Sequence, residues 1–183
     1  VRAAEEMRRR LRARVKRADK ITVGTFHSIC YSMLKGETAL AERALQLKLA
    51  GEAVASPGLT CSPRRLLNDV SAYKSGKGEQ TEGVALYCEL LRASGTADFD
   101  DLLSLALGKE SKTFGWLHVD EFQDVNPVQY ELVRKWSRGG KLFVIGDPDQ
   151  AIYSFRGAAA ECFAGLKADF PDAAVFRLAE SYR

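Results

Sequence analysis

The sequence predicts an α/β domain built on a parallel sheet, with a small all-helical insertion. Short apolar runs at residues 114–119, 142–145 and 174–178 each follow a helical stretch, and strands that alternate with helices in this way indicate a parallel sheet. Residues 38–95 are instead helical in pattern and poor in strands. The chain has 183 residues, of which 46% are apolar and 28% are charged. This composition is typical of a soluble globular domain and argues against a mainly disordered protein.

The sheet domain is expected to begin with residues 1–37, which open on a basic helix. Apolar residues recur every four positions over residues 2–18, the spacing of an amphipathic helix. The first 20 residues hold nine Lys or Arg against three acids, so this helix is the natural surface for a polyanion. The chain starts at Val1 inside this charged pattern, so we expect it to be a piece of a longer protein.

The next elements follow from short-range signals. A strand is predicted at residues 21–26, followed by a helix that Ser28 caps and Gly36 ends. The helical insertion is expected to span residues 38–97, with helices near 63–73 and 81–93.

The sheet domain is predicted to resume over residues 98–183. Asp98 is placed to cap a helix through Leu107. Asn126 as cap and Pro127 at the first helical position predict another helix to about Ser137.

Cysteine and histidine usage favours an ordinary intracellular protein. The four cysteines lie far apart without a C-x-x-C pair, and the chain has only two histidines, so no zinc-ligand spacing is present. Cys30, Cys61, Cys88 and Cys162 are therefore expected to be buried, reduced thiols, and His118, inside a strand, a core residue. No apolar run approaches the roughly 20 residues of a membrane span, so we expect no membrane partner.

Acidic residues follow the apolar run that ends at Val119. Asp120, Glu121 and Asp124 come immediately after it, with Gln123 among them. Ligands of parallel α/β sheets collect at the carboxyl ends of the strands. There, one carboxylate can hold Mg²⁺ and a second can activate a water molecule. The alternative is a solvated acidic turn that caps the next helix.

A second polar turn follows the apolar run at residues 142–145. It reads Gly146-Asp147-Pro148-Asp149-Gln150, and Tyr153, Phe155 and Arg156 come directly after it. Two such turns can form opposite walls of one site, although this sequence is also a good β-turn. Aromatic rings stack on unpaired bases and arginine adds charge, so these residues indicate single-strand chemistry; core packing is the alternative.

Six motifs in chain order resemble those of the superfamily 1 helicases of the UvrD, Rep and PcrA group. They are Arg2-Ala3-Ala4-Glu5-Glu6-Met7, similar to the end of motif Ia; Thr25-Phe26-His27-Ser28, similar to T-F-H-S; Asp98-Phe99-Asp100-Asp101-Leu102-Leu103, similar to D-F-D-D-L-L; Asp120-Glu121-Phe122-Gln123-Asp124, similar to motif II; residues 146–158, similar to motif III; and Glu180-Ser181-Tyr182-Arg183, similar to the start of motif IV. The resemblance runs from residue 2 to residue 183 and implies an incomplete RecA-like sheet of the P-loop NTPase type.

The resemblance also implies residue roles in a parent protein. Asp120 would hold Mg²⁺, Glu121 would be the general base, and Gln150 and Arg183 would reach the γ-phosphate of ATP. Gln123 and Asp124 would couple this site to the DNA groove. The residues implied to touch single-stranded DNA are Phe26, His27, Ser28, Tyr153, Phe155 and Arg156. For His27, a hydrogen-bonded histidine at a strand end is an equal alternative.

The implied parent is an ATP-driven 3′-to-5′ DNA helicase of DNA repair or recombination, cytoplasmic and associated with the bacterial nucleoid. Its partners would be single-stranded or partly duplex DNA and its own second motor domain. Many relatives have Trp where this chain has Phe155, which leaves open a RecB-like subfamily.

One motif of the family does not occur in the chain. No G-x-x-x-x-G-K-[ST] loop, which would cradle the phosphates of ATP, is found in the 183 residues. We therefore expect the isolated chain to bind no ATP or Mg²⁺ and to be inactive as an ATPase.

Two other functions remain open at this point. One is a binding module that grips nucleic acid or a repair partner without using nucleotide. The other is a metal nuclease, which would use the acids Asp98, Asp100, Asp101, Asp120 and Glu121.

Overall fold

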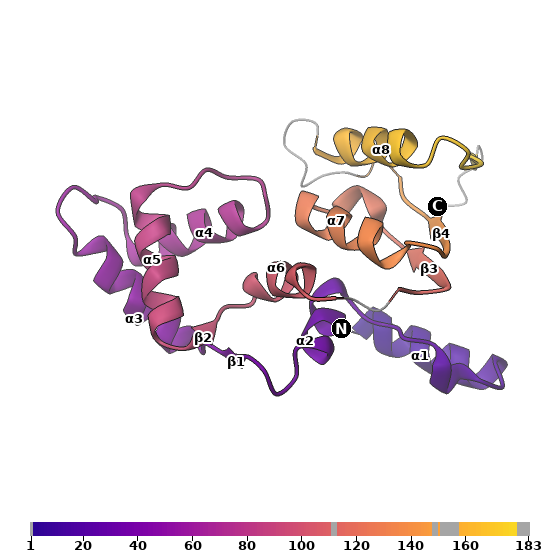
Figure 1. Cartoon of the computed structure of the whole chain (residues 1–183), viewed down its shortest axis with the longest axis horizontal. Helices are drawn as coiled ribbons and strands as arrows, with labels where there is room; N and C mark the ends of the chain where they lie inside the picture. The colour runs from indigo at the N-terminus through magenta and orange to yellow at the C-terminus, as the bar shows by residue number, and fades with distance from the viewer. Residues whose placement is uncertain (1, 111–112, 148–149, 151–157, 179–183) are drawn as a thin grey trace.

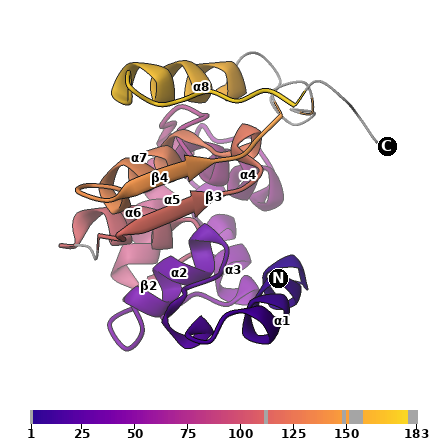
Figure 2. The same ribbon diagram turned by 90° about the vertical axis from the view of Figure 1, so that its right-hand side faces the viewer.

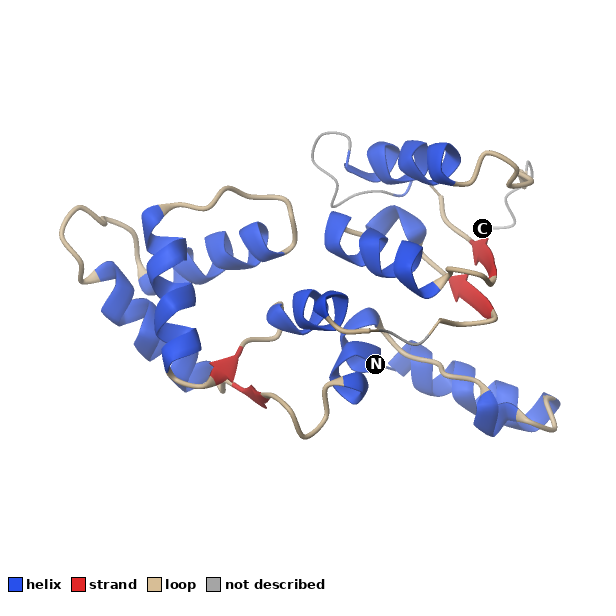
Figure 3. Cartoon of the chain, viewed as in Figure 1, coloured by secondary structure: helices blue, strands red, loops and turns tan. Residues whose placement is uncertain are grey.

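The computed structural model describes residues 2–110, 113–147, 150 and 158–178, and helices predominate among them (Figure 3). The α-helices are α1 (Arg2–Arg14), α2 (Phe26–Met33), α3 (Arg43–Val54), α4 (Pro63–Lys74), α5 (Glu82–Ala93), α6 (Asp101–Gly108), α7 (Pro127–Trp136) and α8 (Ala158–Asp169). The described strands form two parallel pairs, β1 (Ala39–Leu40) with β2 (Thr96–Ala97) and β3 (Trp116–Val119) with β4 (Lys141–Val144). Short 3-10 helices are η1 (Ala18–Lys20) and η2 (Phe122–Asp124).

Helices α3, α4 and α5 form one end of the molecule, which we call the helical lobe (Figure 1). The β3–β4 pair with α7 and α8 forms the other end, and α2 and α6 lie between them. The β1–β2 pair brackets the lobe, because Ala39 aligns with Thr96 and Leu40 with Ala97. The segments that lead into and out of the helical lobe are thereby held together by strand pairing.

The helical lobe has a core of its own. Its buried residues come from all three helices and include Leu49, Leu66, Val84 and Tyr87. Ser62 caps α4 and Thr81 caps α5, each by accepting a hydrogen bond from a backbone N–H of the first turn. The predicted helices near 63–73 and 81–93 are therefore confirmed.

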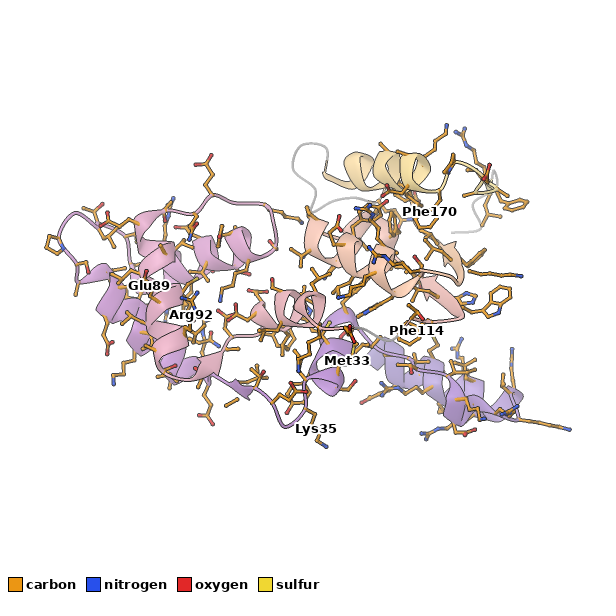
Figure 4. The ribbon with its side chains drawn as sticks, in the orientation of Figure 1. Met33, Lys35, Glu89, Arg92, Phe114 and Phe170 are labelled. Carbon is orange, nitrogen blue, oxygen red and sulfur yellow. The ribbon has the colours of Figure 1, made fainter. Side chains whose placement is uncertain are left out.

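A second core joins α2, α6 and α7. Cys30, Leu102 and Trp136 are buried in it, and Met33 and Phe114, both labelled in Figure 4, pack against it. This core holds the start of α2 and the start of α6 close to the sheet end of the molecule.

The β3–β4 sheet has one covered face and one exposed face. Alternate residues of each strand point to opposite faces, so Val119 and Val144 pack inward against Phe122 and Phe163. Trp116, 64% exposed, and Phe143 point outward. Figure 2 shows the two strands side by side and in the same direction.

His118 lies on the outward face, so the prediction of a core histidine was wrong. Its side chain is exposed and packs only loosely, with ring centroids 6.3 Å from Trp116 and 5.5 Å from Phe143. The strand assignment was right, but burial of a strand residue depends on which face of the sheet other elements cover. The face that carries His118 is not covered by a described helix.

Two predicted strands are not formed. Residues 21–25 are extended but have no strand partner, and Ile21 is 43% exposed. Residues 174–178 have none either, and Phe176 and Leu178 are 86% and 98% exposed. Both segments have strand-like composition, but a strand exists only when another strand supplies its hydrogen bonds. The described sheets show an α/β chain with parallel pairing.

Helix starts agree with the sequence signals, with two shifts. Asp100, not Asp98, stands at the N-cap of α6, because the helix begins at Asp101; Asp98 Oδ1 still accepts the Asp101 N–H at 3.0 Å. Asn126 caps α7 in a capping box completed by Gln129, as the Asn-Pro signal predicted. Thr25, not Ser28, caps α2, because the helix begins at Phe26 and the Thr25 hydroxyl accepts the Ser28 N–H at 3.3 Å. The same helix ends at Met33, before Gly36.

The cysteines differ in their surroundings. Cys30 is fully buried, as predicted, whereas Cys61 and Cys88 are only half-buried, so the expectation for them was wrong in degree. The side chain of Cys162 lies outside the described part. Within the described ranges, every helix is too short or too polar to cross a membrane.

Candidate nucleotide site at the ends of two parallel strands

The ends of β3 and β4 bring the two polar turns together. Val119 aligns with Val144, and the pairing continues past the strands, because Ile145 N donates to Val119 O at 2.8 Å and Phe122 N to Ile145 O at 3.0 Å. Asp120 and Glu121 therefore emerge next to Gly146 and Asp147. This is the juxtaposition expected of neighbouring parallel strands.

Glu121 has a strained backbone. It is the one described non-glycine residue with a positive φ, at φ 52° and ψ 45°, in the left-handed region. This conformation costs an L-residue roughly 1–2 kcal/mol, and such strain clusters at functional sites. The turn leaves both Asp120 and Glu121 exposed at the strand edge, with Asp120 Oδ1 accepting the Glu121 N–H at 3.0 Å.

Gln123 links the two turns. Its side chain is 5% exposed, and each end of its amide is bonded. Nε2 donates to Glu121 Oε2 at 2.6 Å, and Oε1 accepts the Asp147 N–H at 3.0 Å. A buried amide satisfied at both ends fixes the Glu121 carboxylate relative to the second turn.

The second turn extends this path to Gln150. The Gln150 side chain donates from Nε2 to Asp147 Oδ2 at 2.7 Å, and its backbone N–H donates to Asp147 O at 3.1 Å. Gly146 allows the close approach, because a Cβ there would lie 2.8 Å from Gln123 Oε1 and 3.0 Å from Phe163. We call the resulting path, Glu121–Gln123–Asp147–Gln150, the strand-end network.

The strand-end carboxylates fit a Mg²⁺ that is held largely by water and phosphate. Asp120 and Glu121 are exposed, and no cluster of three or more His, Cys, Asp or Glu capable of holding a metal occurs within the described ranges. Mg²⁺ commonly keeps several waters and uses one or two protein carboxylates together with substrate phosphates. The same observation counts against the nuclease alternative, since its five acids do not gather into one cluster.

The Thr25-Phe26-His27-Ser28 segment forms the start of α2. Phe26 is half-buried and stacks on Trp136, with ring centroids 5.8 Å apart. Ser28 is exposed, but its Oγ donates to Thr25 O at 2.9 Å. Three of the predicted DNA contacts lie in this segment. Of these, Phe26 directs its ring into the core, and Ser28 closes the first turn of its own helix.

His27 is mostly buried, with 19% of its side chain exposed. Burial lowers its pKa, and Asp100, with Oδ1 3.9 Å from Nε2, acts in the opposite direction. Nε2 has no hydrogen-bond partner among the described residues, so the alternative of a hydrogen-bonded histidine is not supported at this nitrogen.

Phe99 is a candidate that the sequence reasoning missed. Its ring stacks on His27, with centroids 4.2 Å apart and planes 10° from parallel, and it is still 56% exposed. It also lines a cavity of about 230 Å³ against α4. The signal available in the sequence was an aromatic residue between aspartates in the D-F-D-D-L-L motif.

Several predicted site residues lie outside the described part of the chain. These are Tyr153, Phe155, Arg156 and Arg183. Asp124 is exposed at the end of η2, and its N–H donates to Glu121 O at 2.9 Å.

Comparison with known proteins gives a consistent result. The family model for the UvrD/REP helicase N-terminal domain matches residues 1–76 and 58–171. The ATP-dependent DNA helicase UvrD1 of Mycobacterium bovis is 32% identical over 232 aligned residues, which cover 99% of this chain and 30% of the relative. The ATP-dependent DNA helicase PcrA of Bacillus subtilis is 30% identical, with the same coverages. The chain thus spans about 30% of the length of these relatives.

Proposed function

The chain belongs to the UvrD/REP helicase N-terminal domain family, and from this premise we propose that it is part of the first motor domain of an ATP-dependent 3′-to-5′ DNA helicase. The relatives named above are ATP-dependent DNA helicases. The observation that carries the proposal is the strand-end network, which joins a strained Glu121 to Gln150 across two parallel strands.

The proposed domain plan follows the three parts of the chain. Residues 1–37 and 98–183 belong to a RecA-like motor domain, and residues 38–97 are a helical insertion. The separate core of the helical lobe and the β1–β2 pair at its base support this division.

Each strand-end residue has a proposed task when nucleotide is bound. Mg²⁺ would neutralise charge on the transferred phosphate, and Asp120 would hold it or its waters. Glu121 accepts a proton from the attacking water, and the Gln123 amide keeps its carboxylate aimed at that water. Gln150 and Arg183 would contact the γ-phosphate of bound ATP. Gln123 and Asp124 would couple this site to the DNA surface.

The DNA surface is proposed to include His27, Ser28, Tyr153, Phe155 and Arg156, with Phe99 beside His27. Phe26 supports this surface through its stack on Trp136. The basic α1 helix adds long-range attraction, since Arg12 and Arg14 in its last turn and Lys16 and Arg17 just after it are exposed. Phosphate contacts from such residues make binding strongly dependent on salt.

The isolated chain is proposed to bind single-stranded DNA and not to turn over ATP. Without a phosphate loop, Asp120 and Glu121 have no backbone cradle or lysine to hold the triphosphate. Steady ATP hydrolysis by the purified chain that Glu121→Gln abolishes would contradict this proposal.

DNA binding is tested with a fluorescent oligothymidine and anisotropy. Affinity should fall steeply between about 50 and 200 mM salt, as the release of counterions from phosphates demands. The Tyr153→Ala, Phe155→Ala double variant should bind more weakly, and Phe176→Ala, which removes an aromatic that is 86% exposed, should not. A flat salt response, or equal binding by the double variant, would count against the proposed DNA surface.

A further inference from the structure

A lysine of the helical lobe is buried against the start of α6. Lys74, the last residue of α4, has only 7% of its side chain exposed, although lysine is rarely buried without partners. Its Nζ lies 2.7 Å from Asp98 Oδ2 and 2.7 Å from Asp101 Oδ1. Tyr87 of α5 adds a long contact from its hydroxyl to Asp98 Oδ2, at 3.5 Å.

The two aspartates are also bonded to each other's backbone. Asp101 N donates to Asp98 Oδ1 and Asp98 N donates to Asp101 Oδ2, both at 3.0 Å. This reciprocal pattern resembles a capping box and closes residues 98–101 into one turn, which we call the acidic turn. Lys74 therefore binds a turn whose ends are already fixed relative to each other.

The two residues between these ends lie against His27 at the start of α2, where the DNA surface is proposed. Phe99 stacks on His27 at 4.2 Å, and Asp100 Oδ1 lies 3.9 Å from His27 Nε2. The acidic turn thus has two sides: its ends hold a lysine of the helical lobe, and its middle meets α2. A displacement of the turn would move Phe99 away from His27.

We propose that Lys74 is a positioning residue that sets the Phe99–His27 stack in the orientation that a DNA base meets, so that the helical lobe and the DNA surface move as one. The part of this that concerns DNA rests on the proposed function. The geometric part, that Lys74 fixes the stack, can be tested without DNA.

The geometric part is tested by NMR of the histidine rings in the full chain. His27 and His118 are the only histidines, so His118 on the sheet serves as an internal reference. In Lys74→Met, which keeps the side-chain length but removes the charge, the His27 ring signals should shift and its pKa should rise as Phe99 uncovers it. His118 should not change. Lys48→Met, at a lysine that is 72% exposed on the same lobe, is the matched control and should leave both rings unchanged.

A milder variant covers the case in which Lys74→Met does not fold. Asp101→Asn leaves the pair of Lys74 with Asp98 in place and should move the His27 signals in the same direction by a smaller amount. Unchanged His27 signals in Lys74→Met, or in Asp101→Asn if that is the variant that folds, would overturn the proposal.

The DNA part is tested by a double-mutant cycle on oligothymidine affinity. Phe99→Ala and Lys74→Met should each weaken binding by about 5- to 140-fold, the range that the loss of one stacked base implies. The double variant should bind no more weakly than Phe99→Ala alone, because Lys74 acts through Phe99. Additive losses would overturn the link to DNA. If the wild-type chain does not bind DNA but His27 responds to Lys74→Met, then the proposed function fails and the positioning role stands.

Discussion

Replacing Gln123 with Ala tests the strand-end network most simply. The change removes one hydrogen bond to the Glu121 carboxylate and one from the Asp147 N–H. A neutral hydrogen bond contributes about 1 kcal/mol net and one to a charged group about 1.5–3 kcal/mol. Glu121 is exposed and regains water when its donor is lost, so the low end applies to that bond. We therefore expect the free energy of unfolding to fall by about 2–3 kcal/mol.

Urea denaturation measures this change, with the slope of the unfolding free energy against urea expected to stay the same. Gln80→Ala is the matched control, because Gln80 is exposed in the segment before α5. A loss below about 0.5 kcal/mol in Gln123→Ala, the size of an ordinary surface substitution, would refute the view that this amide holds the two turns together.

Three further predictions concern Gly146 beside Gln123 and two residues of α2, His27 and Cys30. Gly146→Ala should destabilise the chain by about 1–3 kcal/mol in urea denaturation, because its Cβ would lie 2.8 Å from Gln123 Oε1. Gly51→Ala, a helical position with open space around it, should not destabilise the chain, and equal effects of the two substitutions would contradict the packing argument. Burial lowers the pKa of His27, so the folded chain takes up that proton less readily than the unfolded chain. Its contribution to stability should be present above about pH 6.5 and be lost as pH falls further. Unfolding of His27→Gln should accordingly depend less on pH between about 7.5 and 5.5, and an unchanged dependence would contradict this. Burial raises the pKa of Cys30 to about 11. Iodoacetamide should therefore alkylate Cys30 more slowly than Cys61 in the native chain, as peptide mass spectrometry can show, and a faster reaction at Cys30 would contradict its burial.

Local signals in the sequence were sufficient for the elements that depend on neighbours along the chain. The Asn126-Pro127 pair marked the start of α7, because an N-cap followed by proline acts within one turn. The apolar runs at β3 and β4 were also found, and the rule that parallel strands end at one edge placed the turn of Asp120 and Glu121 beside the turn of Gly146 and Asp147.

Features that depend on residues far away along the chain could not be predicted from local sequence signals. Residues 21–26 have strand composition, but no local signal shows whether another strand will pair with them. His118 was placed in a strand correctly, yet its exposure depends on which face the helices cover.

The site shows the same limit. Gln123 was expected to couple the site to DNA, but its contacts with Glu121 and Asp147 follow from strand register, which one sequence does not reveal. Lys74 is 24 positions from Asp98 and looked like any other charged residue at a helix end.

The central claim, that the ends of β3 and β4 form the ATP site of a helicase motor, is tested most directly by ATP hydrolysis. The measurement uses the product of the complete open reading frame that contains this chain, with and without single-stranded DNA. We predict Mg²⁺-dependent turnover that DNA stimulates and that Glu121→Gln abolishes, while Glu131→Gln, an exposed glutamate of α7, leaves it intact. Turnover that Glu121→Gln leaves unchanged would contradict the account.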